Sequence, residues 1–494
     1  MRRGAMDIVR AGLLAGPTAL AFASGGFFTG ARLPAAIAAW ALLALAVAVV
    51  PAPVLPCGWQ ARAALAALAL LGAWTALSTS WAPSHGAARD AVERVLLYLP
   101  ALAASALAWR ERREARWVEP ALATGALIVV GYGLAGRLVP TIAHLSASLR
   151  AGGRLEQPLT YWNAMGALAA IALILCARMA GDETRRTDLR LAAAAAAAPL
   201  GMGLYLSFSR GALAAFGCAL VVLILLVPTW PQLRAAAIAL EAAVLGALVC
   251  APFGAVRALH GGPSGSQGAI VLVLLLGAMT LAAWLQGLSC REDAAHGGEL
   301  GLRAGARWAV LALAAALALA PYAAALGERG AHAGAAQASF GATSSRFTDV
   351  GSSRYSYWKA AVAAFGDAPL KGVGAGGYAT EWLQRRTIAE RVRDAHSLYL
   401  QTLAELGLVG FALLAALFTA VLLAARSALR ADRTLAAGPA AAALVWALHA
   451  GVDWDWQMPA LTLVAVVLTG LLLCRSVPPQ DAAAGAAAAA ERRA

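Results

Sequence analysis

Apolar runs of about 20 residues recur along the whole chain of 494 residues. Each run is long enough for a helix to cross a hydrocarbon layer of about 30 Å. Hydrophobic residues make up 61% of the chain and charged residues 13%, against about 45–50% and about 25% in soluble domains. The sequence therefore predicts an all-α polytopic membrane protein. A soluble enzyme, a secreted disulfide scaffold and a disordered chain are excluded, and so is a transmembrane β-barrel, whose strands alternate in hydropathy.

The runs predict fourteen membrane spans. The expected spans are residues 10–30, 33–50, 62–80, 93–109, 117–136, 161–179, 190–208, 211–228, 236–254, 268–288, 307–326, 404–425, 435–452 and 458–474. Twelve spans are the alternative, because the first pair is interrupted by Pro and Gly and the boundaries around 211–254 are the weakest.

The basic residues lie mostly in short loops on one side of the expected bundle. These loops are residues 110–116, 178–190, 291–307 and 426–433, together with the two chain ends. Short loops rich in Arg and Lys stay in the cytoplasm, so both termini are expected there. The net charge of +13 follows from these loops, and it does not indicate a nucleic-acid partner.

The spans and loops predict four parts of the chain. They are N-terminal transmembrane helices in residues 1–326, a long outer loop in residues 327–403, C-terminal transmembrane helices in residues 404–475 and a cytoplasmic tail in residues 476–494. In the long loop, Ser353 is expected to cap a helix that carries Trp358, Val362 and Phe365 at helical spacing. A second helix is expected from Tyr378 into the span after His396.

Arg210 lies where one expected span ends and the next begins, with almost no loop between them. A permanently charged guanidinium at that depth is expensive unless it faces a cavity and meets an anion. The fork of arginine donors matches a phosphate or diphosphate. The alternative is an interfacial arginine that reaches the lipid headgroups.

His396 begins the segment His396-Ser-Leu-Tyr-Leu400 at the outer start of a span, just after several arginines. A histidine titrates near neutral pH, so this residue is the best placed of the seven histidines to act as a general base. The alternative is a structural histidine. Arg346 and Arg354 flank the polar part of the long loop, and Arg385, Arg386, Arg391 and Arg393 together predict a positive face, unless they only solvate a helix.

Two further outer segments carry polar residues. Asp453-Trp-Asp455 resembles a metal-binding D-x-D pattern, but we prefer Asp453 as an orienting residue that pairs with an arginine or holds His396. Trp162 and Asn163 open another span and offer a ring and an amide to a carbohydrate, although an aromatic belt explains the ring as well. No acidic residue is expected mid-span except Glu241, and the six cysteines lack the spacing of a disulfide framework or metal site.

The ordered motifs resemble the O-antigen ligase and polymerase superfamily. They are the SRGA segment at 209–212, Arg354-x3-Trp358, Pro369-Leu-x-Gly-x-Gly374, His396-Ser-x-x-Leu400 and the Asp453/Asp455 loop. The resemblance implies a C-type glycosyltransferase-like bundle of 12–14 helices with a long, helix-containing periplasmic loop, embedded in the bacterial inner membrane. Its ligases move O-antigen from undecaprenyl diphosphate onto the lipid A core, so these two lipids and the membrane are the expected partners.

The chemistry of such a transfer needs positive charge on the departing diphosphate and a base for the acceptor hydroxyl. The expected site has His396 as base, Arg210, Arg354 and Arg346 at the diphosphate, Arg385, Arg386, Arg391, Arg393, Asn163 and Trp162 at the acceptor or lipid, Asp453 and Asp455 as orienting residues, and no metal or cofactor. An O-antigen polymerase or a protein O-oligosaccharyltransferase is the alternative, since only the acceptor differs. A lipid flippase, from another class, is the third possibility, and it requires polar residues along a central pathway.

Overall fold

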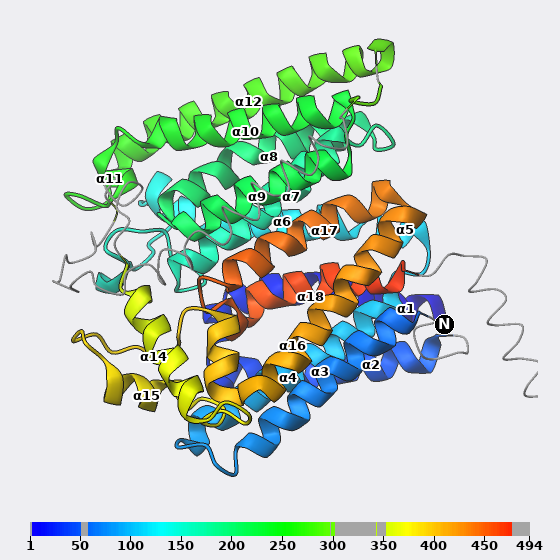
Figure 1. Ribbon diagram of the computed structural model, residues 1–494. Coiled ribbons are helices and arrows are strands. Elements are labelled where there is room, and N and C mark those ends of the chain that lie inside the picture. Colours follow the sequence, from blue (N-terminus) through cyan, green and yellow to red (C-terminus); the bar gives the residue numbers. More distant parts are fainter. Residues whose placement is uncertain (1, 51–57, 297, 302–341, 343–351, 477–494) are drawn as a thin grey trace, which may run out of the picture. The chain divides into compact units, whose positions relative to one another are not determined.

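The computed structural model describes residues 2–50, 58–296, 298–301, 342 and 352–476. The regular elements of these residues are helices (Figure 1), and their one β contact is an isolated bridge between Thr229 and Glu299. Within the described ranges, nine helical segments are long and apolar enough to cross a membrane. The protein is therefore an all-α polytopic membrane protein, which confirms the prediction from its apolar runs.

Thirteen of the fourteen expected spans lie in the described residues, and twelve of them each coincide with a helix. The first, expected at 10–30, is wrong in its bounds, because the helix there is Arg2–Ala21 and the chain turns before the next helix begins at Thr29. The span expected at 307–326 lies outside the described residues. Among the helices that begin earlier than the hydropathy indicates are α4, at His85, and α16, at Leu398. Ser84 and Ser397 cap these helices, because each hydroxyl accepts a backbone N–H three residues on, at 3.4 Å. The earlier start of α4 brings Arg89 and Asp90 inside that helix, and the earlier start of α16 brings in Gln401.

The chain divides into two compact units, and each is described by itself. Unit 1 comprises residues 1–118, 352–440 and 450–494, and unit 2 comprises residues 119–351 and 441–449. The helices of unit 1 are α1 (Arg2–Ala21), η1 (Ser24–Gly26), α2 (Thr29–Val49), α3 (Trp59–Ser78), α4 (His85–Ala108), α5 (Arg112–Ala115), α14 (Arg354–Asp367), α15 (Tyr378–Arg385), α16 (Leu398–Ala431), η4 (Asp455–Gln457) and α18 (Pro459–Cys474). The helix α17 (Arg433–Ala450) contributes to both units.

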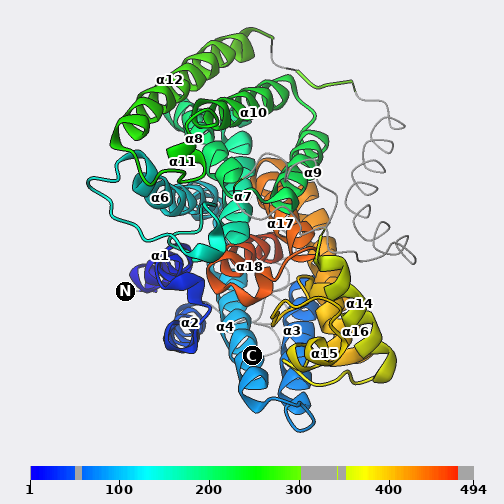
Figure 2. The ribbon, with the colours of Figure 1, turned by 90° about the vertical axis from the view of Figure 1, so that its left-hand side faces the viewer.

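In unit 1, α4 packs between α2, α3 and α18, and α16 packs against α3 and α14 (Figure 2). The helix α16 bends at Gly407, which has φ +65° and ψ −163°. The bend frees the carbonyls of Ala404 and Glu405 to accept the N–H groups of Val373 and Gly374, at 3.0 and 2.9 Å. The turn after Pro369 thereby satisfies the broken part of the helix, as a membrane requires.

Glycine is needed on both sides of this contact. A Cβ atom on Gly407 would lie 2.3 Å from the carbonyl oxygen of Leu370, and one on Gly372 (φ +69°) would lie 2.3 Å from the backbone of Glu405. Both distances are shorter than any real carbon contact. The backbone of the glycine-rich segment after Pro369 therefore packs directly against the backbone of α16 at its bend.

The helices of unit 2 surround α7, which is buried along its length. They are α6 (Val118–Leu138), η2 (Leu149–Ala151), α7 (Trp162–Gly181), α8 (Thr187–Leu206), α9 (Arg210–Leu226), α10 (Trp230–Cys250), α11 (Gly254–Arg257) and α12 (Gly265–His296). The backbones of α8 and α10 approach closely, because a Cβ on Gly246 would lie 2.0 Å from the Ala198 carbonyl oxygen. Small residues at such crossings are typical of membrane helices.

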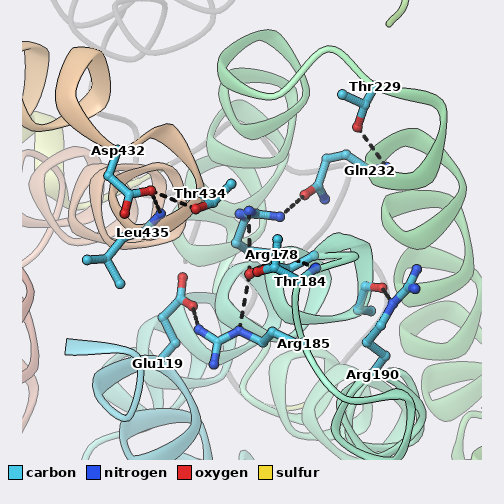
Figure 3. Close-up of polar contacts among 12 residues, drawn as sticks. Glu119, Arg178, Thr184, Arg185, Arg190, Thr229, Gln232, Asp432, Thr434 and Leu435 are labelled. Atoms are coloured by element: carbon cyan, nitrogen blue, oxygen red, sulfur yellow. Dashed lines mark hydrogen bonds and ion pairs between the residues drawn. The ribbon is translucent and has the colours of Figure 1, made fainter. Parts of the chain in front are cut away.

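Buried charges tie the ends of several unit 2 helices together (Figure 3). Arg185 pairs with Glu119 of α6 and lies 3.4 Å from Asp182. Arg178 of α7 donates to the amide oxygen of Gln232 in α10, at 3.1 Å. A buried charge is tolerated when it is paired, so this cluster fastens α6, α7 and α10 without leaving a charge uncompensated.

Candidate active site

The first turn of α14 meets the segment that joins α17 to α18. The guanidinium of Arg354 pairs with the carboxylate of Asp453, which is fully buried, while the Arg354 side chain is 24% exposed. The second oxygen of Asp453 accepts the backbone N–H of Trp454 at 2.9 Å. Asp453 therefore holds an arginine, which is the partner that the sequence favoured, and the arginine still reaches the surface.

His396 lies in the segment just before α16. Its φ of +52° is in the left-handed region, which is uncommon for a residue other than glycine. The imidazole Nδ1 lies 3.0 Å from the carbonyl oxygen of Asp394. A carbonyl can only accept a hydrogen bond, so Nδ1 carries the proton and Nε2 keeps a lone pair. This tautomer can take up a proton at Nε2.

Aromatic residues enclose His396. The Tyr357 ring lies 5.2 Å from the imidazole between centroids, and the Trp454 ring lies edge-on at 6.4 Å. The indole N–H of Trp358 donates to the His396 carbonyl at 3.4 Å. Burial lowers the pKa of His396, the nearby Asp453 carboxylate opposes this, and the Arg354 guanidinium adds to it. The imidazole is therefore held in its neutral, basic form at neutral pH.

Glu390 fastens the loop before His396 to α14. Its carboxylate accepts hydrogen bonds from the hydroxyls of Tyr357 and Ser353, the latter at 3.0 Å, and its carbonyl accepts the indole N–H of Trp382 at 2.8 Å. Burial and the Glu390 carboxylate both raise the pKa of Tyr357, so its phenol stays protonated and keeps donating.

These contacts correct two expectations for the long loop. The second helix does not run from Tyr378 to His396, because α15 ends at Arg385 and the contacts of Glu390 fold the chain back onto α14 and α15. The hydroxyl of Ser353 does not cap α14, because it binds Glu390 instead. The apolar face is also shifted: Val362 is 54% exposed, whereas Tyr357, Ala361 and Ala364 are buried.

The four arginines of this loop do not share one helix face. Arg385 pairs with Asp367 and, at 2.8 Å, with Glu381, and these carboxylates raise its pKa. Arg393 lies 3.5 Å from Asp90. The other two, Arg386 and Arg391, are exposed in the irregular segment after α15. A continuous positive face was therefore the wrong expectation, since two of the charges face carboxylates.

Gln401, which was not predicted as a site residue, holds the segment before His396 in place. The Gln401 amide nitrogen donates to Asp394 at 3.2 Å and to Glu405 at 3.1 Å, and its oxygen accepts the N–H of Ala395 at 3.1 Å. Gln401 and Glu405 are one helical turn apart near the start of α16, among mostly apolar residues. Polar residues at that spacing inside a span are the signal that could have revealed them.

The expectation of no mid-span acid except Glu241 is also wrong. Glu93 and Glu405 lie inside α4 and α16, whereas Glu241 is exposed on α10. The capped starts of α4 and α16 lie before the apolar runs, which is why the hydropathy boundaries left Glu93 and Glu405 at the edges of spans.

In unit 2, Arg210 is the first residue of α9, three residues after Ser207 ends α8. Phe208, at φ +49°, turns the chain between them. Ser209 caps α9 by accepting the N–H of Ala212 at 3.3 Å, and its hydroxyl lies 3.4 Å from Nε2 of the buried His449. The turn therefore places Arg210 at a helix N-terminus, where the helix dipole also favours an anion.

The other unit 2 candidates already have partners. The guanidinium of Arg154 covers the Trp162 ring at 3.6 Å from its centroid, and the Asn163 amide donates to the Tyr161 hydroxyl at 2.8 Å.

Of the remaining candidates, Asp455 is fully buried at the start of η4, and Arg346 lies outside the described residues. Among the expected site residues of unit 1, the fold thus gathers His396, Arg354 and Asp453.

In unit 1, a histidine, an arginine and a carboxylate therefore lie close together, in a protein whose described helices are long and apolar enough to cross a membrane. The sequence model of a protein family described as "O-Antigen ligase" matches residues 263–415, a range that contains Arg354, His396 and Gln401. No curated protein matches the chain by sequence. Over residues 263–415, which are less than half of the chain, the protein is similar to the O-antigen ligase family.

Proposed function

We propose that this protein is an O-antigen ligase. It transfers O-antigen polysaccharide from undecaprenyl diphosphate to the lipid A core at the periplasmic face of the bacterial inner membrane, which completes lipopolysaccharide. The family match at residues 263–415 supports the proposal, and so does the neutral His396 beside an arginine that reaches the surface.

The observation that carries the proposal is the hydrogen bond from His396 Nδ1 to the Asp394 carbonyl, 3.0 Å long. It leaves Nε2 as the basic atom, and the neighbouring rings keep the imidazole neutral. Nε2 takes the proton of the acceptor hydroxyl as that oxygen attacks the anomeric carbon. Direct attack inverts the anomeric centre and needs no covalent intermediate.

Arginines supply the charge that the departing diphosphate requires. Arg354, held by Asp453, donates to the phosphate oxygens. Arg210, at the start of α9 in unit 2, and Arg346 of the long loop are the other two candidates for this role. Guanidinium groups match phosphate oxygens with two parallel hydrogen bonds, and they stabilise charge as it develops on the leaving group. With this fixed charge, the reaction proceeds without a divalent cation.

The test is transfer by the purified full-length protein. Undecaprenyl diphosphate-linked glycan and lipid A core are mixed with the protein, with EDTA present, and a larger glycolipid is expected on a gel. A parallel reaction without lipid A core separates the alternatives, because a polymerase lengthens the lipid-linked glycan itself. Absence of product in both reactions, or product only after Mg²⁺ is added, would contradict the proposal.

A further inference from the structure

Arg94 is a buried charge that the proposed mechanism does not use. It lies nine residues after the start of α4, roughly 14 Å along the helix, and it is 7% exposed. Its Nε atom is buried and donates no hydrogen bond to any atom of the described residues. Such a charge inside a membrane helix is costly unless it is hydrogen-bonded, and the described residues leave this nitrogen open to a ligand.

The acidic residues nearest to Arg94 on its own helix are engaged with another arginine. Arg32 of α2 pairs with Asp90 at 2.6 Å and with Glu93 at 2.8 Å. Neither carboxylate lies within ion-pair distance of Arg94 among the described residues. Two acidic residues on other segments, Asp394 and Glu405, are in turn joined through Gln401.

Arg94 lines a cavity within unit 1 of about 80 Å³, which is room for several water molecules. The cavity lies among α3, α4 and α16, and α3 packs against both α4 and α16 (Figure 2). Its lining includes Asp394, Thr402, Glu405, Phe27 and Trp456. Residues that carry donors, acceptors and rings therefore line one small space.

A second cavity of about 510 Å³ continues from the first. The two share part of their lining, which is Ala87, Asp90, Gly376, Ala379 and Arg393. The rim of the wider cavity includes the exposed residues Thr29, Arg89 and Leu383. A ligand can therefore enter from the surface of unit 1 and place its end at Arg94.

The mixture of charges decides the class of ligand. An anion would meet the carboxylates of Asp394 and Glu405 in the same cavity, and a hydrocarbon chain would leave the charged groups of its lining, which also includes Asp90 and Arg393, unsolvated. A sugar hydroxyl both accepts and donates hydrogen bonds, so it can accept from Arg94 and donate to a carboxylate at once. The C–H face of a sugar ring also has an apolar partner in Phe27 or Trp456.

We propose that the Arg94 cavity is a saccharide-binding site, in which sugar hydroxyls accept hydrogen bonds from Arg94 and donate them to Asp394. Asp394 lines the cavity, and its carbonyl accepts the hydrogen bond of His396 Nδ1. Given the proposed function, on which this step rests, the bound sugar belongs to the acceptor glycan, and the site holds that glycan beside the base.

The test measures binding of one probe, the lipid-free and dephosphorylated core oligosaccharide of lipopolysaccharide. Full-length protein in nanodiscs is titrated by saturation-transfer NMR. Arg94→Gln, which keeps hydrogen-bonding capacity but removes the charge and the fork, is expected to bind at least about tenfold more weakly, since bonds to charged groups are the stronger ones. Arg62→Gln, at an exposed arginine of α3, serves as the matched control and should bind like the parent.

Two further measurements make the result decisive. Ala379 lines both cavities, so the larger side chain of Ala379→Leu narrows the passage between them and should also weaken binding of the probe. This variant tests the site even if Arg94→Gln does not insert into the membrane. Inorganic phosphate should not displace the probe. Unchanged binding by Arg94→Gln, or displacement by phosphate at the probe's own concentration, would overturn the saccharide site.

Transfer kinetics separate this inference from the proposed function. Arg94→Gln should raise the KM for the acceptor by about tenfold and leave the KM for the donor unchanged. If the parent protein transfers no glycan, the proposed function fails, while the binding titration still decides whether the cavity holds a saccharide.

Discussion

His396 is the residue on which the proposed chemistry depends, because its hydrogen bond to Asp394 leaves Nε2 ready to accept a proton. His396→Ala should insert normally and still bind the diphosphate-linked donor, while transfer falls about 10²–10⁴-fold, the usual contribution of a general base. His144→Ala, at an exposed histidine, is the control. Near-parental turnover by His396→Ala would give the role of base to another group.

The pH dependence of transfer tests the charges around His396. A base works when it is neutral, and burial lowers the pKa of His396 from an ordinary value of about 6.5. The rate should therefore hold as the pH falls through 6.5 and decline only below the lowered pKa. Asp453 raises this pKa and Arg354 lowers it. In kcat/KM profiles, Asp453→Asn should move the acidic limb to lower pH and Arg354→Gln to higher pH. Shifts of the same sign would contradict this electrostatic account.

Arg210 tests whether geometry matters beyond charge. Arg210→Lys keeps the positive charge at the start of α9 but loses the planar fork. Transfer should drop by about tenfold or more while the amount of inserted protein, measured by immunoblot, stays equal to that of the parent. A lysine variant that works as well as the parent would remove Arg210 from the diphosphate site.

Among the elements, the bend of α16 is the feature that positions both Gln401 and the turn after Pro369. Gly407 has a conformation open almost only to glycine, and its place against Leu370 leaves no room for a Cβ. Gly407→Ala should therefore destabilise the protein by about 1–3 kcal/mol or more, which a thermal unfolding scan in detergent measures. Gly366→Ala is the matched control, because nothing lies within 4 Å of its Cβ position. Equal melting temperatures for the two variants would show that the bend tolerates a side chain.

The helices were predictable and some of their ends were not. Hydropathy alone located the apolar bodies of α4 and α16, because burial in lipid requires such runs. It could not locate Ser84 and Ser397 as caps, since each lies in a polar segment several residues before the run. The end of α15 at Arg385 could not be predicted from the sequence either. It depends on the contact of Trp382 with Glu390, which is a tertiary contact that helical periodicity does not encode.

At the scale of the whole molecule, the sequence predicted the class of protein and the order of its motifs better than the site itself. His396 and Asp453 are 57 residues apart in the chain, and residue type alone marked each as a candidate. Arg94, Gln401 and Glu405 were missed because each reads alone as one polar residue at the edge of an apolar run. Only the packing of α4 against the other helices of unit 1 brings Arg94 to a cavity shared with Glu405.

The orientation of the whole chain is the last prediction, and it decides which compartment His396 faces. The short loops at 110–116, 178–190 and 426–433 are rich in arginine, and such loops remain in the cytoplasm, whereas long loops cross regardless of charge. Green fluorescent protein fused after Arg116, Arg190 or Arg430 should therefore fluoresce, and alkaline phosphatase fused after Gly366 should be active in the periplasm. The swapped reporter at each position is the control and should be silent. Phosphatase activity after Arg190 together with fluorescence after Gly366 would invert the topology and place the site on the cytoplasmic side, away from a periplasmic transfer.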